Sequence, residues 1–425
     1  MRYLPQTKQS RAEMLQAVGA SNVDDLFKDV PKDAFIDGLA NLPLKQGELE
    51  VERALGAYAN QNMAAPEGPF FLGAGTYYHH IPASVDTIIQ RSEYLTAYTP
   101  YQPEIAQGTL QMIFEFQTFI AQLTGQEVAN ASLYDGATAT AEAALMAMRV
   151  TKRNKVVIGN ALHPHYRGTL KSYMGNLGSA LEDGKPDGNT ACVIVQSPDF
   201  YGKPEKYEEW RRLCNESGAL LVVVVNEIVS LGLLPAPVDA DIVCGEAQSI
   251  GLPMSFGGPH LGFFACQEKY LRQMPGRLCG MTEDVDGKRG FVLTLSTREQ
   301  HIRREKATSN ICTNQGLCAL AFTAHMSLLG EDGFKRLAKL NHEMACKLAD
   351  SVSKVKNVKI LSETFFNEFV VELSKSSAEV VESLITRGII AGYALDDNQL
   401  LLSATEMTTD VDIELLCDAL SEVLA

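Results

Sequence analysis

Short apolar runs alternate with helical patterns through the middle of the chain. The runs begin at Val156, Cys192, Leu220, Asp241 and Leu261, and a helical pattern at residues 207–217 separates the second run from the third. Continuous apolar strands separated by helices are typical of a mostly parallel sheet that is covered on both faces. We therefore predict an α/β fold with a large domain at residues 61–327.

The pattern changes after a long helix, which we expect at residues 314–329. Beyond it, strand-like and helix-like segments alternate at residues 358–361, 368–373, 378–387, 399–403 and 410–424. This mixture predicts a small C-terminal α+β domain at residues 328–425.

The first sixty residues show helical start signals rather than strands. Ser10-Arg-Ala-Glu13 and Ser21-Asn-Val-Asp24 both have the spacing of a capping box, followed by apolar residues. Residues 1–60 are therefore predicted to form a helical arm. Such an arm either clasps a partner subunit or packs on its own domain.

Composition narrows the classes of function. The chain has 425 residues, 46% of them hydrophobic, and a net charge of −15, which disfavours nucleic acid and anionic membranes as partners. Apolar runs stay shorter than a membrane helix requires, and the first residues lack the apolar segment of a secretory signal. Nine scattered cysteines without a CxxC pair fit reduced thiols better than disulfides or a metal site. We therefore expect a soluble cytoplasmic protein.

Two loop-rich segments carry aromatic residues that could serve a site. Glycine and proline break regular structure at residues 70–82 and 98–103, so loops should present Tyr77, Tyr78, Tyr98 and Tyr101. These tyrosines either line a site or pack a domain edge with their hydroxyls in water.

Other candidates follow from the expected sheet. Small residues at the start of a helix, Gly136, Thr138 and Thr140, suit either a phosphate or close packing. Ligands of such sheets bind at the carboxyl ends of the strands, where the sequence places His163, Ser197, Asn226, Glu227 and Gln248.

A lysine is missing where one type of cofactor enzyme needs it. The layout of arm, large domain and small domain resembles fold type I pyridoxal-phosphate (PLP) enzymes, aminotransferase-like transferases whose cofactor lysine follows a strand and precedes a glycine-rich loop. Here no lysine lies between Lys206 and Lys269, and Gln248-Ser249 stands at that position. Ser249 cannot form an imine, and Asn226 cannot hold a pyridinium proton as an aspartate does. Lys306 is the alternative nucleophile, although its charged neighbours favour a structural role.

Four segments, residues 98–108, 256–260, 274–277 and 294–316, closely resemble the P-protein of the glycine cleavage system, glycine dehydrogenase (decarboxylating). The likeness covers almost the whole chain. More narrowly, the length and the missing lysine resemble the first subunit of the two-chain P-protein, whose second subunit carries PLP.

The resemblance implies an activity shared between subunits. Glycine is decarboxylated with the partner's PLP, and the aminomethyl group passes to the lipoyl arm of the H-protein, whose disulfide is the oxidant; the T-protein and L-protein belong to the same system. It implies no catalytic residue on this chain alone and no metal. No nicotinamide site is expected, because a convincing GxGxxG after a strand is lacking.

The resemblance also implies contributions to the partner's site. Thr308, Ser309 and Asn310 would reach the partner's PLP phosphate. Tyr98 and Tyr101, together with Tyr77, Tyr78 and His79, would line the approach of glycine and the lipoyl arm. Arg298 or Arg303 could hold a carboxylate, or pair with Glu299 or Glu305. Two alternatives remain, which are a purely structural or regulatory subunit and a self-sufficient PLP enzyme that uses Lys306.

Overall fold

The computed structural model describes residues 5–36, 38, 42, 45–96, 98, 100–311 and 313–425. Thr99 and Cys312, from two of the family-like segments, and residues 1–4 of the predicted start lie outside the described residues. The chain divides into two compact units, residues 1–63 and 64–425. Within the described residues, we find no helix with both the length and the apolar character that a membrane crossing requires.

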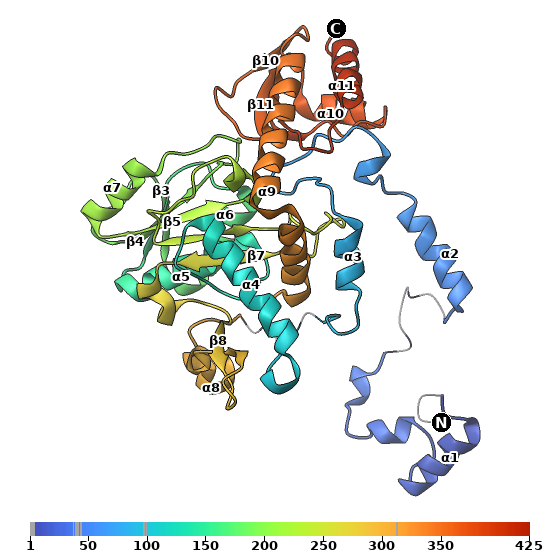
Figure 1. Cartoon of the computed structure of the whole chain (residues 1–425). Helices are drawn as coiled ribbons and strands as arrows, with labels where there is room; N and C mark the ends of the chain where they lie inside the picture. Colours follow the sequence, from blue (N-terminus) through green and yellow to red (C-terminus); the bar gives the residue numbers. More distant parts are fainter. Residues whose placement is uncertain are drawn as a thin grey trace. The chain divides into compact units, whose positions relative to one another are not determined.

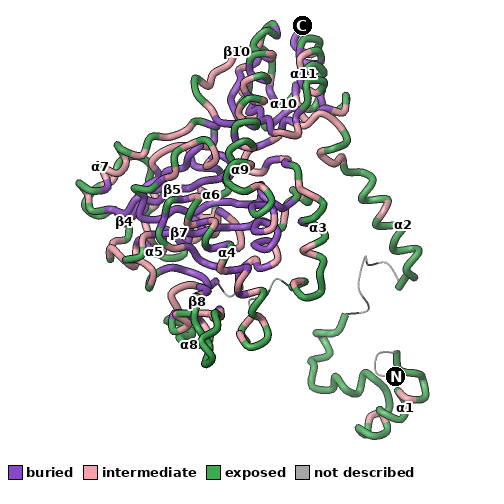
Figure 2. Tube along the Cα trace, viewed as in Figure 1, coloured by how far each residue is buried: buried purple, intermediate pink, exposed green. Residues whose placement is uncertain are grey.

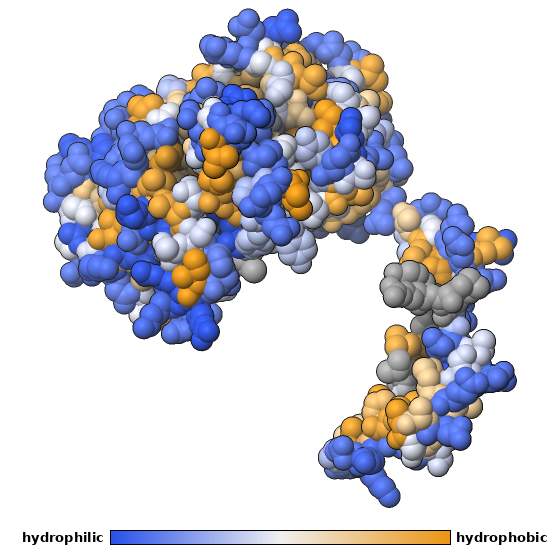
Figure 3. Space-filling view, turned by 60° about the horizontal axis from the view of Figure 1, so that its bottom comes forward, coloured by the Kyte–Doolittle hydropathy of each residue, from blue (hydrophilic) through white to orange (hydrophobic). Residues whose placement is uncertain are grey.

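The first unit consists of helices whose side chains are mostly exposed. It contains α1 (Lys8–Ala17), α2 (Glu48–Ala59) and two 3-10 turns, η1 (Asp24–Phe27) and η2 (Lys32–Ala34). None of its described residues is buried (Figure 2). Figure 3 shows apolar side chains on its surface, and the exposed ones include Met14, Leu26, Ile36, Leu55 and Tyr58.

The predicted start of the first helix is wrong by one turn. The N-cap is Thr7, whose hydroxyl accepts a hydrogen bond from the Ser10 amide at 3.1 Å. Ser10 lies inside the helix, because the sequence offers a second hydroxyl residue three positions earlier. The second expected helix start, at Ser21, is followed only by the turn η1.

The second unit is built on a seven-stranded sheet of order β1-β7-β6-β5-β4-β2-β3. Its strands are β1 (Val128–Ala129), β2 (Lys155–Ile158), β3 (Ala180–Asp183), β4 (Thr190–Gln196), β5 (Leu220–Val225), β6 (Ile242–Glu246) and β7 (Gly262–Cys266). Strands β2 to β6 are parallel, and β7 pairs antiparallel with β6 and β1. The mostly parallel sheet of the sequence analysis is thereby confirmed, and β1 and β3 are additional strands.

Helices cover both faces of this sheet (Figure 1). Alternate strand residues point to opposite faces, so Val223 joins one buried cluster and Val222 joins another. The first cluster includes α3 (Ala83–Ile89), α4 (Gln107–Thr124), α7 (Tyr207–Ser217) and the first part of α9 (Gly316–Val352); the second includes α5 (Gly136–Thr151) and α6 (Pro164–Leu177).

Helix α9 runs from the central sheet to a second, antiparallel sheet (Figure 1). It bends at Gly330, whose φ of 60° is left-handed, close to the predicted helix end at residue 329. The second sheet has the order β10-β11-β13-β12. Its elements are β10 (Val358–Ile360), β11 (Glu368–Leu373), α10 (Ser377–Ile385), β12 (Tyr393–Asp396), β13 (Gln399–Ser403) and α11 (Asp410–Val423). The boundary at residues 327 and 328 stays a prediction, because both sheets belong to one compact unit.

A small hairpin completes the second unit. Strands β8 (Cys279–Glu283) and β9 (Arg289–Leu293) pair with each other alone, and the short helix α8 (Gln300–Arg303) follows them. Figure 1 shows the hairpin and α8 beside one another, at the end of the unit away from the second sheet.

Candidate functional site

A cavity of about 340 Å³ lies where β6 ends and where α5 and α6 begin. The carboxyl ends of parallel strands are the usual ligand edge of such sheets. Twelve residues line the cavity, namely Ala74, Gly75, Thr76, Asp135, Gly136, Ala137, His163, His165, Tyr166, Thr169, Glu246 and His260. Of the residues predicted at strand ends, His163 lines it directly.

The position expected to carry a cofactor lysine is closed by internal hydrogen bonds. The Ser249 hydroxyl donates to Glu227 Oε2 at 2.9 Å, and Glu227 Oε1 accepts from the Val229 amide at 2.9 Å. Ser249 and Glu227 are both buried. This position therefore offers neither an amine nor an unpaired carboxylate.

Asn226 is equally committed. Its Oδ1 accepts a hydrogen bond from the Tyr166 hydroxyl at 2.7 Å, and both side chains are buried. An amide that already accepts from a tyrosine offers no negative charge to a pyridinium ring.

The start of α5 holds a carboxylate of the chain itself. Glu246 Oε2 accepts from the Gly136 amide at 3.0 Å, and the Asp135 side chain caps the Thr138 amide at 2.6 Å. The Thr140 hydroxyl donates to the Gly136 carbonyl. A Cβ on Gly136 would lie 2.0 Å from Tyr166 Oη, so close packing explains this glycine. The residues present do not fit PLP on this chain.

The pKa values of the cavity residues reflect the carboxylates that the chain itself places there. Burial raises the pKa of the Tyr166 hydroxyl well above its usual value, and the carboxylates of Glu246 and Asp135 raise it further. The Glu246 carboxylate, 3.6 Å from His260, raises the pKa of that imidazole. His163 is different, since burial lowers its pKa; its Nδ1 accepts from the His165 amide and its Nε2 donates to the Ala74 carbonyl.

The remaining strand-end candidates support loops. The Ser197 hydroxyl accepts from the Glu205 amide at 3.0 Å, and the Gln248 side chain donates to the Leu252 carbonyl at 2.7 Å. Both side chains are buried and committed to neighbouring backbone.

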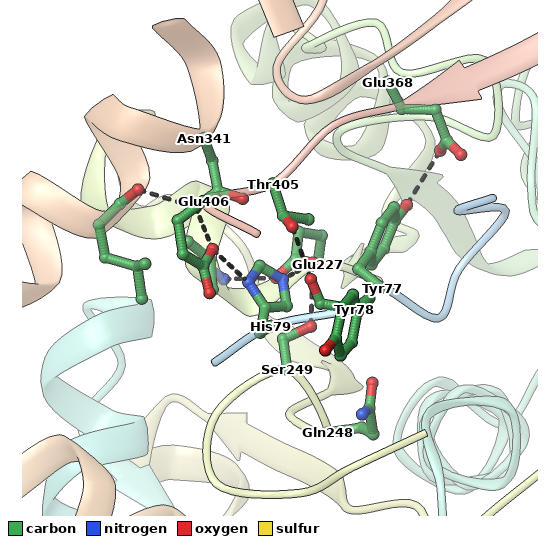
Figure 4. A network of polar contacts seen from close by, with 12 residues as sticks. Tyr77, Tyr78, His79, Glu227, Gln248, Ser249, Asn341, Glu368, Thr405 and Glu406 are labelled. Carbon is green, nitrogen blue, oxygen red and sulfur yellow. Dashed lines mark hydrogen bonds and ion pairs between the residues drawn. The ribbon is translucent and has the colours of Figure 1, made fainter. Parts of the chain in front are cut away.

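A buried ionic network joins the two sheets of the second unit (Figure 4). His79 lies between two carboxylates, with Nδ1 at 2.9 Å from Glu406 and Nε2 at 3.2 Å from Glu227. Glu406 also accepts from the His80 amide at 2.7 Å and the Asn341 side chain at 2.9 Å. The two carboxylates overcome burial and raise the pKa of His79 to about 10, so the imidazole is charged at neutral pH.

Tyr77 and Tyr78 flank this network. The Tyr77 hydroxyl donates to Glu368 Oε2 at 2.9 Å, and the Tyr78 carbonyl accepts from the Thr405 hydroxyl at 2.6 Å. Tyr77 and His79 are 5% and 6% exposed, and Tyr78 is half-buried. These three residues therefore tie loop 70–82 to the C-terminal sheet.

The stability of the fold should depend on pH through the buried carboxyl group of Glu368. Burial raises its pKa from 4.5 to about 7. Because the pKa of Glu368 is higher in the folded than in the unfolded chain, the protonated carboxyl contributes its full stabilisation below pH 4.5. This contribution is lost as the pH rises through 7. We expect Glu368→Gln to gain up to ~3 kcal/mol relative to wild type between pH 4.5 and 8. Urea unfolding of both proteins across that range measures the difference, and a difference that does not change with pH would contradict the assignment.

The tyrosines of the second loop lie at the surface instead. Tyr98 is 71% exposed and Tyr101 is 56% exposed. Arg277 donates to the Tyr101 hydroxyl and forms a 2.6 Å ion pair with Glu299. The Tyr101 ring also contacts His301 edge-on, with ring centres 6.2 Å apart. Three of the family-like segments therefore meet at Tyr101.

The segment after α8 continues this surface. The Thr308 amide donates to the Arg298 carbonyl at 3.0 Å, the Ser309 hydroxyl accepts from the Ile311 amide, and Asn310 is exposed beside Gln300. Arg298 is buried, donates to the Met274 and Gly276 carbonyls and lies 4.0 Å from the Glu299 carboxylate.

The other charged candidates of this segment are exposed. Arg303 and Lys306 both lie at the surface in the charged stretch that ends at η8 (Arg304–Lys306). An exposed ammonium among charged neighbours is typical of a solvated surface group rather than of an imine-forming lysine.

Sequence reasoning missed several residues of the site, among them Tyr166, Glu246, Asn341, Glu368, Thr405 and Glu406. Glu246 carried a usable signal, because it ends an apolar strand at the ligand edge of the sheet. The others carried none, since their partners lie far away in the sequence.

The fold defines the class of protein first. A mutant of C-DES with glycine covalently linked to its PLP cofactor superposes with a TM-score of 0.60 at 13% identity, covering 87% of this chain and 99% of that one. Mouse CSAD in its apo form gives a TM-score of 0.67 at 12% identity, covering 99% and 92%. The fold is that of fold type I PLP-dependent enzymes, as predicted.

Closer relatives define the family. A family model described as "Glycine cleavage system P-protein" matches residues 1–420. The probable glycine dehydrogenase (decarboxylating) subunit 1 of Maricaulis maris is 54% identical, and that of Caulobacter sp. (strain K31) is 55% identical, over all of this chain and at least 99% of each relative. A crystal structure of inhibitor-bound glycine decarboxylase (P-protein) superposes with a TM-score of 0.91 at 42% identity over both full chains.

The chain therefore belongs to the P-protein family of the glycine cleavage system. Its function is that of a P-protein subunit, and the predicted family is confirmed.

Proposed function

We propose that this chain is the cofactor-free subunit of a two-subunit glycine decarboxylase and that it completes an active site whose PLP is carried by the second subunit. One observation carries the proposal. Ser249 stands where the cofactor lysine is expected, and its hydroxyl donates to Glu227 inside a closed network. PLP, when bound to the partner, supplies the electron sink that decarboxylation of an amino acid requires.

The contribution of this chain lies on the surface around Tyr101. Fold type I dimers complete each site with residues of the neighbouring chain, and Tyr98 and Tyr101 are the exposed aromatic candidates. Arg277 and His301 hold the Tyr101 ring, which keeps its position defined before a partner arrives. The two tyrosines contact glycine or the lipoyl arm, while the buried Tyr77 and His79, with Tyr78, position their loop.

A second group of polar side chains, half-buried at Thr308 and Ser309 and exposed at Asn310, serves the cofactor. Thr308, Ser309 and Asn310 bring two hydroxyls and an amide to one loop, and these groups can donate hydrogen bonds to a phosphate. They reach the PLP phosphate of the partner subunit. The Arg298 carbonyl accepts a hydrogen bond from the Thr308 amide, and the buried Arg298 side chain is hydrogen-bonded within this chain. These contacts fix the start of the loop.

The partners follow from the family. The second subunit carries PLP, the lipoylated H-protein accepts the aminomethyl group, and the T-protein and L-protein act in the same cytoplasmic system. The apolar side chains of the first unit support an arm that clasps the second subunit, because its described residues bury no core of their own.

Glycine–bicarbonate exchange tests the proposal. We expect no exchange from this chain alone, little or none from the second subunit alone, and full exchange from the mixture with PLP and H-protein. Full exchange from the second subunit alone would reduce this chain to a structural or regulatory subunit. Exchange by this chain alone would establish a self-sufficient enzyme and contradict the proposal.

A further inference from the structure

Glu246 has an unusual set of partners for a buried carboxylate. Its Oε1 accepts from the amides of Gln248 at 3.1 Å and Leu261 at 2.7 Å, and its Oε2 accepts from the Gly136 amide at 3.0 Å. The side chain is 4% exposed at the end of β6. Two other segments, at Gly136 and Leu261, and the chain directly after Glu246 thus aim backbone N–H groups at one carboxylate.

These donors form an anion cradle. Gly136 is the first residue of the 16-residue helix α5, where the helix dipole favours negative charge. Converging backbone N–H groups bind anions in the same way. The cradle opens into the cavity that contains His163 and Tyr166, and Ser249 follows three residues after Glu246.

We infer that Glu246 is a built-in substitute for a phosphate, so that removing its charge opens a latent site for phosphate monoesters in this chain. The inference rests on the proposed function, because it explains how the cofactor-free subunit keeps its own pocket closed. The ligand class is a phosphate monoester beside an aromatic ring, such as a B6 vitamer phosphate.

The Glu246 carboxylate closes the site, because it occupies the Gly136 amide and brings negative charge to it. A cavity of about 340 Å³ falls within the range of small-molecule pockets. A phosphate placed at the amides of α5 would meet the carboxylates of Glu246 and Asp135 at close range, and like charges repel strongly in a buried site. Burial is the main cause of the raised pKa of Tyr166, and the same two carboxylates raise it further.

Two variants and one control test the inference. Glu246→Gln removes the charge but keeps an oxygen that can accept from the Gly136 amide, and Glu246→Ala removes both. Glu142→Gln is the matched control, since Glu142 is also buried, lies in α5 and does not line the cavity. The probes are inorganic phosphate and pyridoxamine 5′-phosphate, which cannot form an imine and therefore needs no lysine.

Calorimetric titration of the full chain by itself gives the result, because the partner subunit would contribute a B6-binding site of its own. We expect at least a tenfold tighter binding of pyridoxamine 5′-phosphate by the Glu246 variants than by wild type and the Glu142 control. Equal affinity in folded variants, or tight binding by wild type, overturns the inference. If both variants unfold, phosphate should restore their circular dichroism and chloride at equal ionic strength should not; failure of that rescue also overturns it.

The outcome is separable from a failure of the proposed function. That failure would appear as cofactor bound covalently to the wild-type chain or as exchange by the wild-type chain alone. Neither of these measurements uses a Glu246 variant or pyridoxamine 5′-phosphate.

Discussion

Replacement of His79 by glutamine is expected to lower the free energy of unfolding by about 3–5 kcal/mol, because it leaves two buried carboxylates without their counter-charge. Glu227 and Glu406 both lie within 3.2 Å of the imidazole. Urea unfolding at pH 6 measures the loss. His80→Gln is the matched control, since the neighbouring His80 side chain is exposed and should change stability by less than about 0.5 kcal/mol.

The pH dependence of this difference identifies its cause. The pKa of His79 is raised from 6.5 to about 10, so its stabilisation is complete below pH 6.5 and is lost as the pH rises through 10. The pKa of Glu406 is lowered to about 2, chiefly by His79 against the effect of burial, so its contribution is present above pH 4.5 and is lost as the pH falls through 2. The nearby His325 has a pKa lowered to about 4 and stays neutral above that pH. The variant should therefore differ most from wild type between pH 4.5 and 6.5. A difference that is the same at pH 6 and pH 10 would rule out the ionic explanation.

Substitution of the exposed tyrosines should impair catalysis without impairing the fold. We expect Tyr98→Ala and Tyr101→Ala each to lower glycine decarboxylation by the reconstituted complex by about 10- to 100-fold, the size of effect that follows from loss of substrate positioning. Both side chains are largely exposed, so unfolding of the chain should change little. The assay is release of carbon dioxide from labelled glycine with saturating H-protein.

Two further variants sharpen the comparison. Tyr101→Phe keeps the ring but removes the hydroxyl that accepts from Arg277, so it separates ring contact from hydrogen bonding. Tyr393→Ala is the matched control, because Tyr393 is 43% exposed on the C-terminal sheet. Undiminished decarboxylation by both alanine variants, in a complex that still assembles, would favour a structural or regulatory subunit.

The local sequence determined most of the fold. The apolar runs at residues 192–195 and 220–225 were predicted as strands because burial on both faces leaves no polar alternation. Gly125 ends the helix α4 with a left-handed φ of 66°, a conformation that glycine adopts more readily than other residues. Short edge strands such as β1 and β3 were not predicted, since their residues are few and partly exposed.

The site was less accessible to sequence reasoning. Ser249 and Asn226 could be identified because their positions follow from strand ends and from the family pattern. The burial of His79 could not be foreseen, because it depends on Glu227 and Glu406, which are 148 and 327 residues away. Carboxylates that are distant in the sequence leave no local pattern. The sequence around Tyr77 therefore indicates only a loop, without its buried contacts.

Borohydride reduction of the assembled complex with PLP, followed by mass spectrometry of both subunits, identifies the subunit whose lysine binds the cofactor. We expect every reduced pyridoxyl adduct to lie on a lysine of the second subunit and this chain to keep its unmodified mass. A stoichiometric adduct on Lys306, or on any other lysine of this chain, would contradict this expectation.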